Sequence, residues 1–176
     1  SEFDAEEVIY DVCKKYYDGT VTEDEALKEL SEKVPSFSTT SHKMTLGLFN
    51  YMIEGKKYSR RSNIEITVCL IRNIGKDYGK EKMLNALSAT RENIIYYYGQ
   101  TGNKSNCMRK CCQQLADENG FDLSFGEDMF DGITPKKSTS SALADDDVDS
   151  TRYWIYSPGD NACKWDEFHK AGIMAI

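Results

Sequence analysis

Apolar residues recur at every third or fourth position along the first 118 residues, which is the spacing of one face of an amphipathic helix. Six segments carry this pattern: 4–18, 22–34, 36–54, 64–74, 80–98 and 105–118. Four of them are followed directly by a residue that commonly ends a helix, namely Gly19, Pro35, Gly55 and Gly99. The sequence therefore predicts a mainly α fold, a bundle of about six helices.

Three of these helices are expected to begin with a capping pair, in which a polar side chain and a Glu three residues later bond each other's backbone amides. The pairs are Asp4 with Glu7, Thr22 with Glu25 and Ser62 with Glu65. The hydroxyl-rich stretch 36–41 is expected to cap the third helix.

Residues 64–74 fit two patterns. Their apolar positions alternate as in a strand over 64–70, yet Ile64, Val68, Ile71 and Ile74 also have helical spacing. We predict a helix, because the Ser62–Glu65 pair precedes it and the pattern is longer than a typical strand. Strand pairing within 64–71 is the alternative.

The helical pattern ends at residue 118. We predict a helical domain over 4–118 and an irregular segment with a linker over 119–150, since residues 135–149 are mostly Lys, Ser, Thr, Ala and Asp. From 151 to 176 a strand, a turn, a short helix and an apolar run predict a short β-α-β piece. We expect that piece to be truncated, because its last run stops at Ile176. Residues 1–3 could be native or the remnant of a cloning site, and we assign them no function.

The composition, 40% hydrophobic and 29% charged, is typical of a soluble globular protein. No run reaches the roughly 18 apolar residues of a membrane span, so we expect a cytoplasmic protein with no membrane partner.

The net charge of −7 conceals three blocks. Residues 1–36 hold 4 Lys/Arg and 11 Asp/Glu, residues 37–116 hold 13 and 5, and residues 117–176 hold 5 and 13. A basic block between acidic ones is expected of a polyanion-binding surface, although solvated helix faces also produce such blocks.

The cysteines give little support to a metal site. Only Cys107, Cys111 and Cys112 cluster, and their spacing is not that of paired zinc ligands. We interpret them as small core residues of a reduced protein and expect no metal and no cofactor.

The densest polar signal is residues 56–61, Lys-Lys-Tyr-Ser-Arg-Arg, between two predicted helices. We predict that this connection is exposed, lies on the same face as Arg109 and Lys110, and holds DNA phosphates, with Tyr58 packed inward or against a sugar. The alternative is that Arg60 or Arg61 is a structural ion-pair partner. The candidate nucleic-acid-binding residues are Lys56, Lys57, Tyr58, Arg60, Arg61, Arg109 and Lys110.

Three consecutive tyrosines, Tyr96, Tyr97 and Tyr98, are further candidates for stacking on bases. Consecutive residues cannot share one helix face, so at least one of them is expected in the core.

Two segments resemble parts of restriction proteins. Residues 153–161 (Tyr-Trp-Ile-Tyr-Ser-Pro-Gly-Asp-Asn), the Trp-Asp-Glu-Phe of 165–168 and the Gly-Ile-Met-Ala-Ile of 172–176 are similar to the opening of the PUA-like (EVE-type) module of McrB-like proteins. In that family such modules read modified or flipped bases in an aromatic pocket. The chain holds only the start of the module, so we interpret Trp154 and Trp165 as core residues.

The second resemblance covers about 65 residues and includes residues 49–61, 77–79 and 86–87. Its motif is an apolar helix that ends in Gly-Lys-Lys-Tyr-Ser-Arg, and it is similar to a helical domain at the N-terminus of McrB-like and HNH-type restriction proteins. The resemblance implies a DNA-targeting role and supplies no catalytic residue.

The sequence leads to two hypotheses. The first is a DNA-binding or DNA-targeting fragment of a bacterial restriction (anti-phage defence) protein, whose partners are DNA, including modified DNA, and other parts of a restriction complex. The second is an assembly domain that docks partner subunits of a multi-domain ATPase or nuclease. We expect no enzymatic activity and no catalytic residues, because the sequence has neither a P-loop nor a His-rich nuclease motif.

Overall fold

The computed structural model describes residues 4–136, and these residues contain six α-helices, one short 3-10 helix and no strand. The elements are α1 (Ala5–Tyr17), α2 (Glu23–Lys33), α3 (Thr39–Ile53), α4 (Ile64–Tyr78), α5 (Lys80–Thr101), α6 (Asn106–Glu118) and η1 (Glu127–Phe130). The prediction of a mainly α bundle is confirmed for this part of the chain. The predicted β-α-β piece over 151–176, and the linker beyond residue 136, lie outside the described residues.

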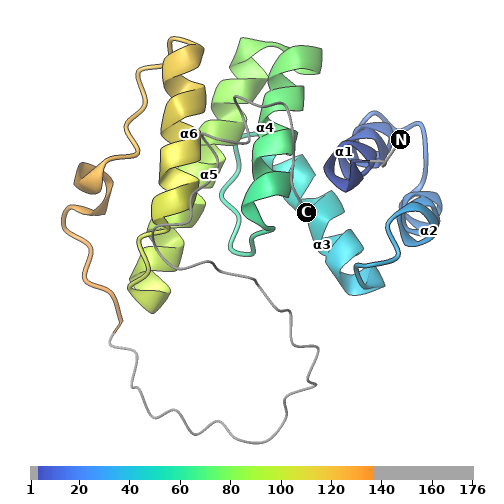
Figure 1. The fold of residues 1–176 in the computed structure, drawn as a ribbon, viewed down its shortest axis with the longest axis horizontal. Coiled ribbons are helices and arrows are strands. Elements are labelled where there is room, and N and C mark those ends of the chain that lie inside the picture. The colour runs from blue at the N-terminus through green and yellow to red at the C-terminus, as the bar shows by residue number, and fades with distance from the viewer. Residues whose placement is uncertain (1–3, 137–176) are drawn as a thin grey trace, which may run out of the picture.

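The centre of the fold is formed by α3, α4 and α5. Helix α4 packs along α5 and also contacts α1, α3 and α6, while α5 contacts α3 and α6. Figure 1 shows the α1–α2 hairpin on one side of this centre, and α6 with the segment 119–136 on the other side. None of the described helices combines the length and the apolar character needed to cross a membrane.

One continuous core runs through all six helices. Each helix contributes the apolar face that its spacing predicts, and fully buried members are Val12, Leu30, Met52, Ile74, Leu87 and Cys112. Burying an aliphatic side chain of this size stabilises a fold by about 1.5–3 kcal/mol, so the shared apolar core holds the helices together.

Residues 64–74 lie in α4, so the predicted helix is confirmed. The prediction that Ser62 caps this helix, in a pair with Glu65, is wrong, because the cap lies one position later. Asn63 is the cap, and its Oδ1 accepts a hydrogen bond from the Ile66 amide at 2.8 Å. Asn63 immediately precedes the first helical residue in an extended conformation, and from there its short side chain reaches the third amide of the helix.

The other two predicted capping pairs differ from each other. Thr22 and Glu25 form the reciprocal pair, in which the Glu25 amide donates to Thr22 Oγ1 and the Thr22 amide donates to Glu25 Oε2. Asp4 precedes α1 as predicted, but its side chain makes no capping hydrogen bond. Glu7 Oε1 instead accepts a hydrogen bond from the side-chain amide of the buried Asn73, at 3.1 Å. Glu7 thus bonds a residue of α4 rather than the start of its own helix.

The segment after α6 packs against the helices. Phe125, Met129 and Phe130 are buried, and the Phe130 ring lies 4.4 Å from that of Tyr98 on α5. Helix α5 continues past the predicted end at Gly99 to Thr101, and the Gly99 carbonyl accepts a hydrogen bond from the Lys136 amide at 2.8 Å. Residues 119–136 are therefore part of the same packed body as the helices.

Candidate nucleic-acid interface

An open groove of about 520 Å³ lies between α3 and the connection that follows it. Hydroxyls, three cations, apolar side chains and one glycine line it. These residues are Thr39, Thr40, Lys43, Met44, Gly47, Leu48, Tyr51, Lys57, Tyr58, Ser59 and Arg60.

The end of α3 fixes the start of this connection. Gly55 has a left-handed φ of 69°, its amide donates to the Met52 carbonyl, and the Lys56 amide donates to the Tyr51 carbonyl at 2.8 Å. These two bonds form a Schellman motif, which turns the chain sharply while it satisfies the last carbonyls of the helix. The backbone of Lys56 is thereby held directly beside the last turn of α3.

Tyr58 anchors the middle of the connection to α5. Its side chain is only 6% exposed, and its hydroxyl donates to Thr90 Oγ1 at 3.0 Å. The Asn93 side chain donates to the Tyr58 carbonyl at 2.9 Å. Burial raises the pKa of the Tyr58 hydroxyl, so this group stays protonated and acts as the donor.

Arg61 is a second anchor. Its Nε donates to Asn93 Oδ1 at 3.2 Å, its Nη1 donates to Ser105 Oγ at 2.8 Å, and its guanidinium lies 3.9 Å from the centre of the Tyr97 ring. Within residues 4–136 it forms no ion pair, so polar groups and the face of an aromatic ring take the place of a carboxylate. Burial lowers the pKa of this guanidinium.

Tyr58 packs inward, which is one of the two positions expected for it, whereas the prediction that Arg61 is exposed is wrong, because its side chain is half-buried. The physical reason is the stripe of Thr90, Asn93 and Tyr97, which α5 presents at helical spacing and which binds both side chains. The alternative of a structural role fits Arg61, although its partners are neutral. Arg60 is exposed and has no such partner among the described residues.

Three cations of the connection are exposed: Lys56 and Lys57, which precede Tyr58, and Arg60, which lies between the two anchors. None of the ion pairs within residues 4–136 includes them. The neighbouring acid, Glu54, bonds Tyr17 and Lys82, and Lys56 attracts it without forming an ion pair. Lys57 Nζ lies 5.5 Å from the centre of the Tyr96 ring, a weak cation–π distance that leaves the ammonium exposed.

Tyr51 is the aromatic residue of the groove. Its side chain is 49% exposed, and of the nine tyrosines in the described part of the chain it is the one with neither a side-chain hydrogen bond nor a ring contact. Tyr51 is not among the candidate residues predicted from the sequence. The signal that was available is a second stripe on α3, Met44, Gly47 and Tyr51, which lies outside the stripe of buried residues.

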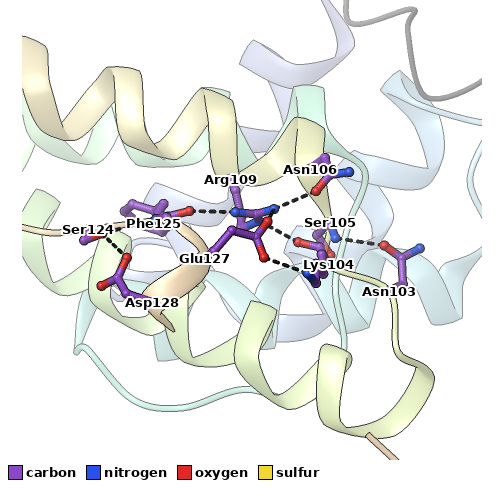
Figure 2. A network of polar contacts seen from close by, with 10 residues as sticks. Asn103, Lys104, Ser105, Asn106, Arg109, Ser124, Phe125, Glu127 and Asp128 are labelled. Atoms are coloured by element: carbon purple, nitrogen blue, oxygen red, sulfur yellow. Dashed lines mark hydrogen bonds and ion pairs between the residues drawn. The ribbon is translucent and has the colours of Figure 1, made fainter. Parts of the chain in front are cut away.

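Arg109 has a different role from the one predicted. Figure 2 shows its guanidinium bonded to the segment after α6, donating to the Phe125 carbonyl at 3.1 Å and to Glu127 Oε1 at 3.0 Å. It also lies 5.1 Å from the centre of the Phe130 ring, and its side chain is 11% exposed. Arg109 therefore fastens residues 125–130 to α6, and the expectation that its side chain is exposed is wrong.

Lys110 is exposed, and with Arg109 it lines a second groove of about 480 Å³ between α6 and residues 125–126. This second groove shares no lining residue with the groove at α3. The structure brings Lys57 and Arg60 together and leaves Arg109 and Lys110 in another place.

Each of the three consecutive tyrosines contacts a different group. Tyr96 lies near Lys57, Tyr97 lies under Arg61, and Tyr98 packs against Phe130 at the edge of the core. Of these three rings, that of Tyr96 lies near an exposed cation, Lys57. Tyr97 and Tyr98 pack against Arg61 and Phe130, so they support the fold.

The described cysteines are free thiols, with Cys111 and Cys112 buried and Cys107 half-buried. Burial raises the pKa of the Cys112 thiol. Within residues 4–136 no group of three or more His, Cys, Asp or Glu side chains is placed to hold a metal ion.

Comparison of the chain with known protein families, curated proteins and solved structures finds no match in any of the three. Any ligand of the groove is therefore inferred from its own residues, which include the exposed cations Lys57 and Arg60 and the exposed ring of Tyr51.

Proposed function

We propose that residues 4–136 form a DNA-binding domain that holds the phosphate backbone at the groove between α3 and the connection 56–61. The observation that carries the proposal is the pair Lys57 and Arg60, which line the groove, are exposed and form no ion pair within the described residues. Lys56 adds a third cation beside them. A cation that is exposed and forms no ion pair is available to an external anion, and in nucleic acids that anion is the backbone phosphate.

The frame of the connection supports the same proposal. Tyr58 and Arg61 are bonded to α5 on either side of Ser59 and Arg60, and the Schellman motif holds Lys56. A connection that is already ordered loses less conformational entropy when it binds, so more of the attraction between cations and phosphates appears as affinity.

Hydroxyls complete the groove. Thr39 and Thr40, at the start of α3, and Ser59, on the connection, all line it. Ser38 caps α3 by accepting a hydrogen bond from the Ser41 amide, and the first turn contains no acidic residue that would repel a phosphate from the positive end of the helix dipole. Hydroxyl donors and helix N-termini are common partners of phosphate oxygens in DNA-binding proteins.

We place this domain in a restriction protein, as a targeting part that is not itself catalytic. The resemblance of residues 49–61 to the N-terminal domains of McrB-like proteins supports this placement. Strand cleavage and nucleotide hydrolysis would then belong to other domains or subunits.

The test is the salt dependence of binding to unrelated duplex DNA. Each phosphate contact contributes about 0.9 to the slope of log Kd against log salt, so Lys57→Ala combined with Arg60→Ala should flatten the slope by about 1.8. The control Lys28→Ala combined with Lys76→Ala removes the same charge from exposed positions outside the groove lining and should change the slope much less.

Arg61→Lys separates binding from folding. It keeps the charge but loses the planar donors that meet Asn93 and Ser105, so we expect a lower Tm and an unchanged slope. If the wild-type domain binds no DNA at any salt concentration but binds another subunit of a restriction complex, the domain serves assembly and the proposal is wrong.

A further inference from the structure

We infer that the groove takes single-stranded nucleic acid, with one base stacked on the ring of Tyr51 and the neighbouring phosphates held by Lys57 and Arg60. The inference rests on the proposed function, because it names the form of nucleic acid that the same groove prefers. It adds Tyr51, which no phosphate contact requires.

The first observation is the environment of Tyr51. A tyrosine on a helix of a packed domain normally buries its ring or bonds its hydroxyl. Each of the other eight described tyrosines has a hydroxyl hydrogen bond, a ring–ring contact or a cation over its ring. Tyr51 has none of these among the described residues and is 49% exposed, although it stands on α3, the helix that carries the fully buried Phe49 and Met52. Its ring is therefore presented to a partner outside this domain.

The second observation is the space beside that ring. Side chains on a helix lean toward its N-terminus, so the ring of Tyr51 lies toward Gly47, one turn earlier. A Cβ built on Gly47 would meet no atom within 4 Å, so nothing fills that space. Met44 and Leu48 give the groove apolar surface there, as the flat face of a nucleobase requires.

The third observation is that the ring of Tyr51 and the cations lie close together along the chain. The amide of Lys56 donates to the carbonyl of Tyr51, so the stacking ring and the first cation share one turn of backbone. Lys57 and Arg60 line the same groove as Tyr51. In a nucleic acid, a base and its flanking phosphates are also separated by only a few bonds. One nucleotide can therefore stack its base on Tyr51 while its phosphates contact Lys57 and Arg60.

Duplex DNA fits this arrangement less well. Its bases are stacked on each other inside the helix, so only an unpaired base offers its face to Tyr51. An acidic peptide would satisfy Lys57 and Arg60 but would leave the ring and its apolar surroundings unused. The combination of ring and cations therefore favours a single strand.

The experiment measures fluorescence anisotropy with the whole chain and three labelled probes: a thymidine 12-mer, a 12-mer of the same length with abasic sugars, and a 12-base-pair duplex. Stacking of one base on an aromatic side chain contributes about 1–3 kcal/mol, so Tyr51→Ala should weaken binding of the thymidine 12-mer at least fivefold. Tyr51→Phe keeps the ring and should bind like the wild type. On the abasic probe and the duplex, Tyr51→Ala should have no effect.

The outcomes separate this inference from the proposed function. Equal losses on the thymidine and abasic probes would mean that Tyr51 acts through the connection and would overturn the stacking role. Wild-type binding to the duplex with no change in Tyr51→Ala on any probe would overturn the inference and leave the phosphate site standing. Absence of wild-type binding to all three probes would overturn both. Because Tyr51 is half exposed, an unchanged Tm in Tyr51→Ala is the expected folding control.

Discussion

The side chain of Asn93 on α5 donates a hydrogen bond to the backbone carbonyl of Tyr58 at 2.9 Å. The same carboxamide accepts from Arg61 Nε, so one buried residue bonds both anchors of the connection 56–61. The position of the groove cations is therefore set from inside the helical bundle.

Asn93→Ala should destabilise the domain by about 2–3 kcal/mol, because it leaves the Tyr58 carbonyl and the Arg61 Nε without partners in a partly buried site. Urea unfolding followed by circular dichroism measures this loss. Tyr58→Phe is the matched comparison, since it removes only the bond from the hydroxyl to Thr90 and should cost about 1 kcal/mol. Equal costs for the two variants would show that Asn93 is not the main anchor.

Gly55→Ala should cost about 1–2 kcal/mol, since the residue has a φ of 69° and an added Cβ would lie 3.2 Å from Asn85 Cγ. Gly47→Ala is the control on the same helix, where a Cβ meets open space and helix propensity should add about 0.5–1 kcal/mol of stability. Thermal unfolding of both variants gives the comparison. A Gly55→Ala variant as stable as the wild type would contradict the role of the Schellman motif.

Glu6→Gln should raise the Tm at pH 8 and change it little at pH 4. Burial, a hydrogen bond with Asp4 and repulsion from Asp4 and Glu65 raise the pKa of Glu6 to about 7. The folded state therefore holds this proton more tightly than the unfolded chain, so Glu6 favours folding below its ordinary pKa of 4.5, and that contribution is lost as the pH rises through about 7. Glutamine imitates the protonated form at every pH. A shift in Tm of the same size at both pH values would mean that charge is not the cause, and Glu32→Gln on the exposed side of α2 is the control.

Arg109→Ala should loosen the segment that follows α6. The change removes hydrogen bonds to the Phe125 carbonyl and to Glu127 together with the contact to the Phe130 ring, at a cost of about 2 kcal/mol. Hydrogen exchange should accelerate over residues 125–131 and stay slow in α4. Lys76→Ala, at an exposed position on α4, should leave the exchange rates of this segment nearly unchanged. Protection that persists in Arg109→Ala would assign the docking to Phe125, Met129 and Phe130 alone.

The helices could be predicted from the sequence because their signals are local. Helical spacing identified all six, and it correctly assigned residues 64–74 to α4 despite the strand-like alternation. The first and last residues of the helices were less predictable. Asn63 rather than Ser62 caps α4, and α5 continues to Thr101. Small differences in backbone angle decide which of two neighbouring residues caps or ends a helix.

The candidate site could be predicted only in part. Lys57 and Arg60 lie in the groove, but nothing near Arg61 in the sequence indicates that it packs on Tyr97, which lies 36 positions later. In the same way, Arg109 turns inward because of Glu127 and Phe130, which follow it in a stretch without periodicity. Whether a cation is exposed depends on which residues distant in sequence pack against it, and the local sequence pattern does not contain that information.

The spacing of the anchors also gives this domain room for variation. Tyr58 and Arg61 fasten the connection from beneath, while positions 56, 57, 59 and 60 face solvent and carry little of the packing. The chemistry displayed at those four positions can be exchanged without rebuilding the bundle, much as a binding loop is exchanged on an antibody framework. A library randomised at these positions, with Asn93 and both anchors kept, is thus a route to variants of this scaffold that select different ligands.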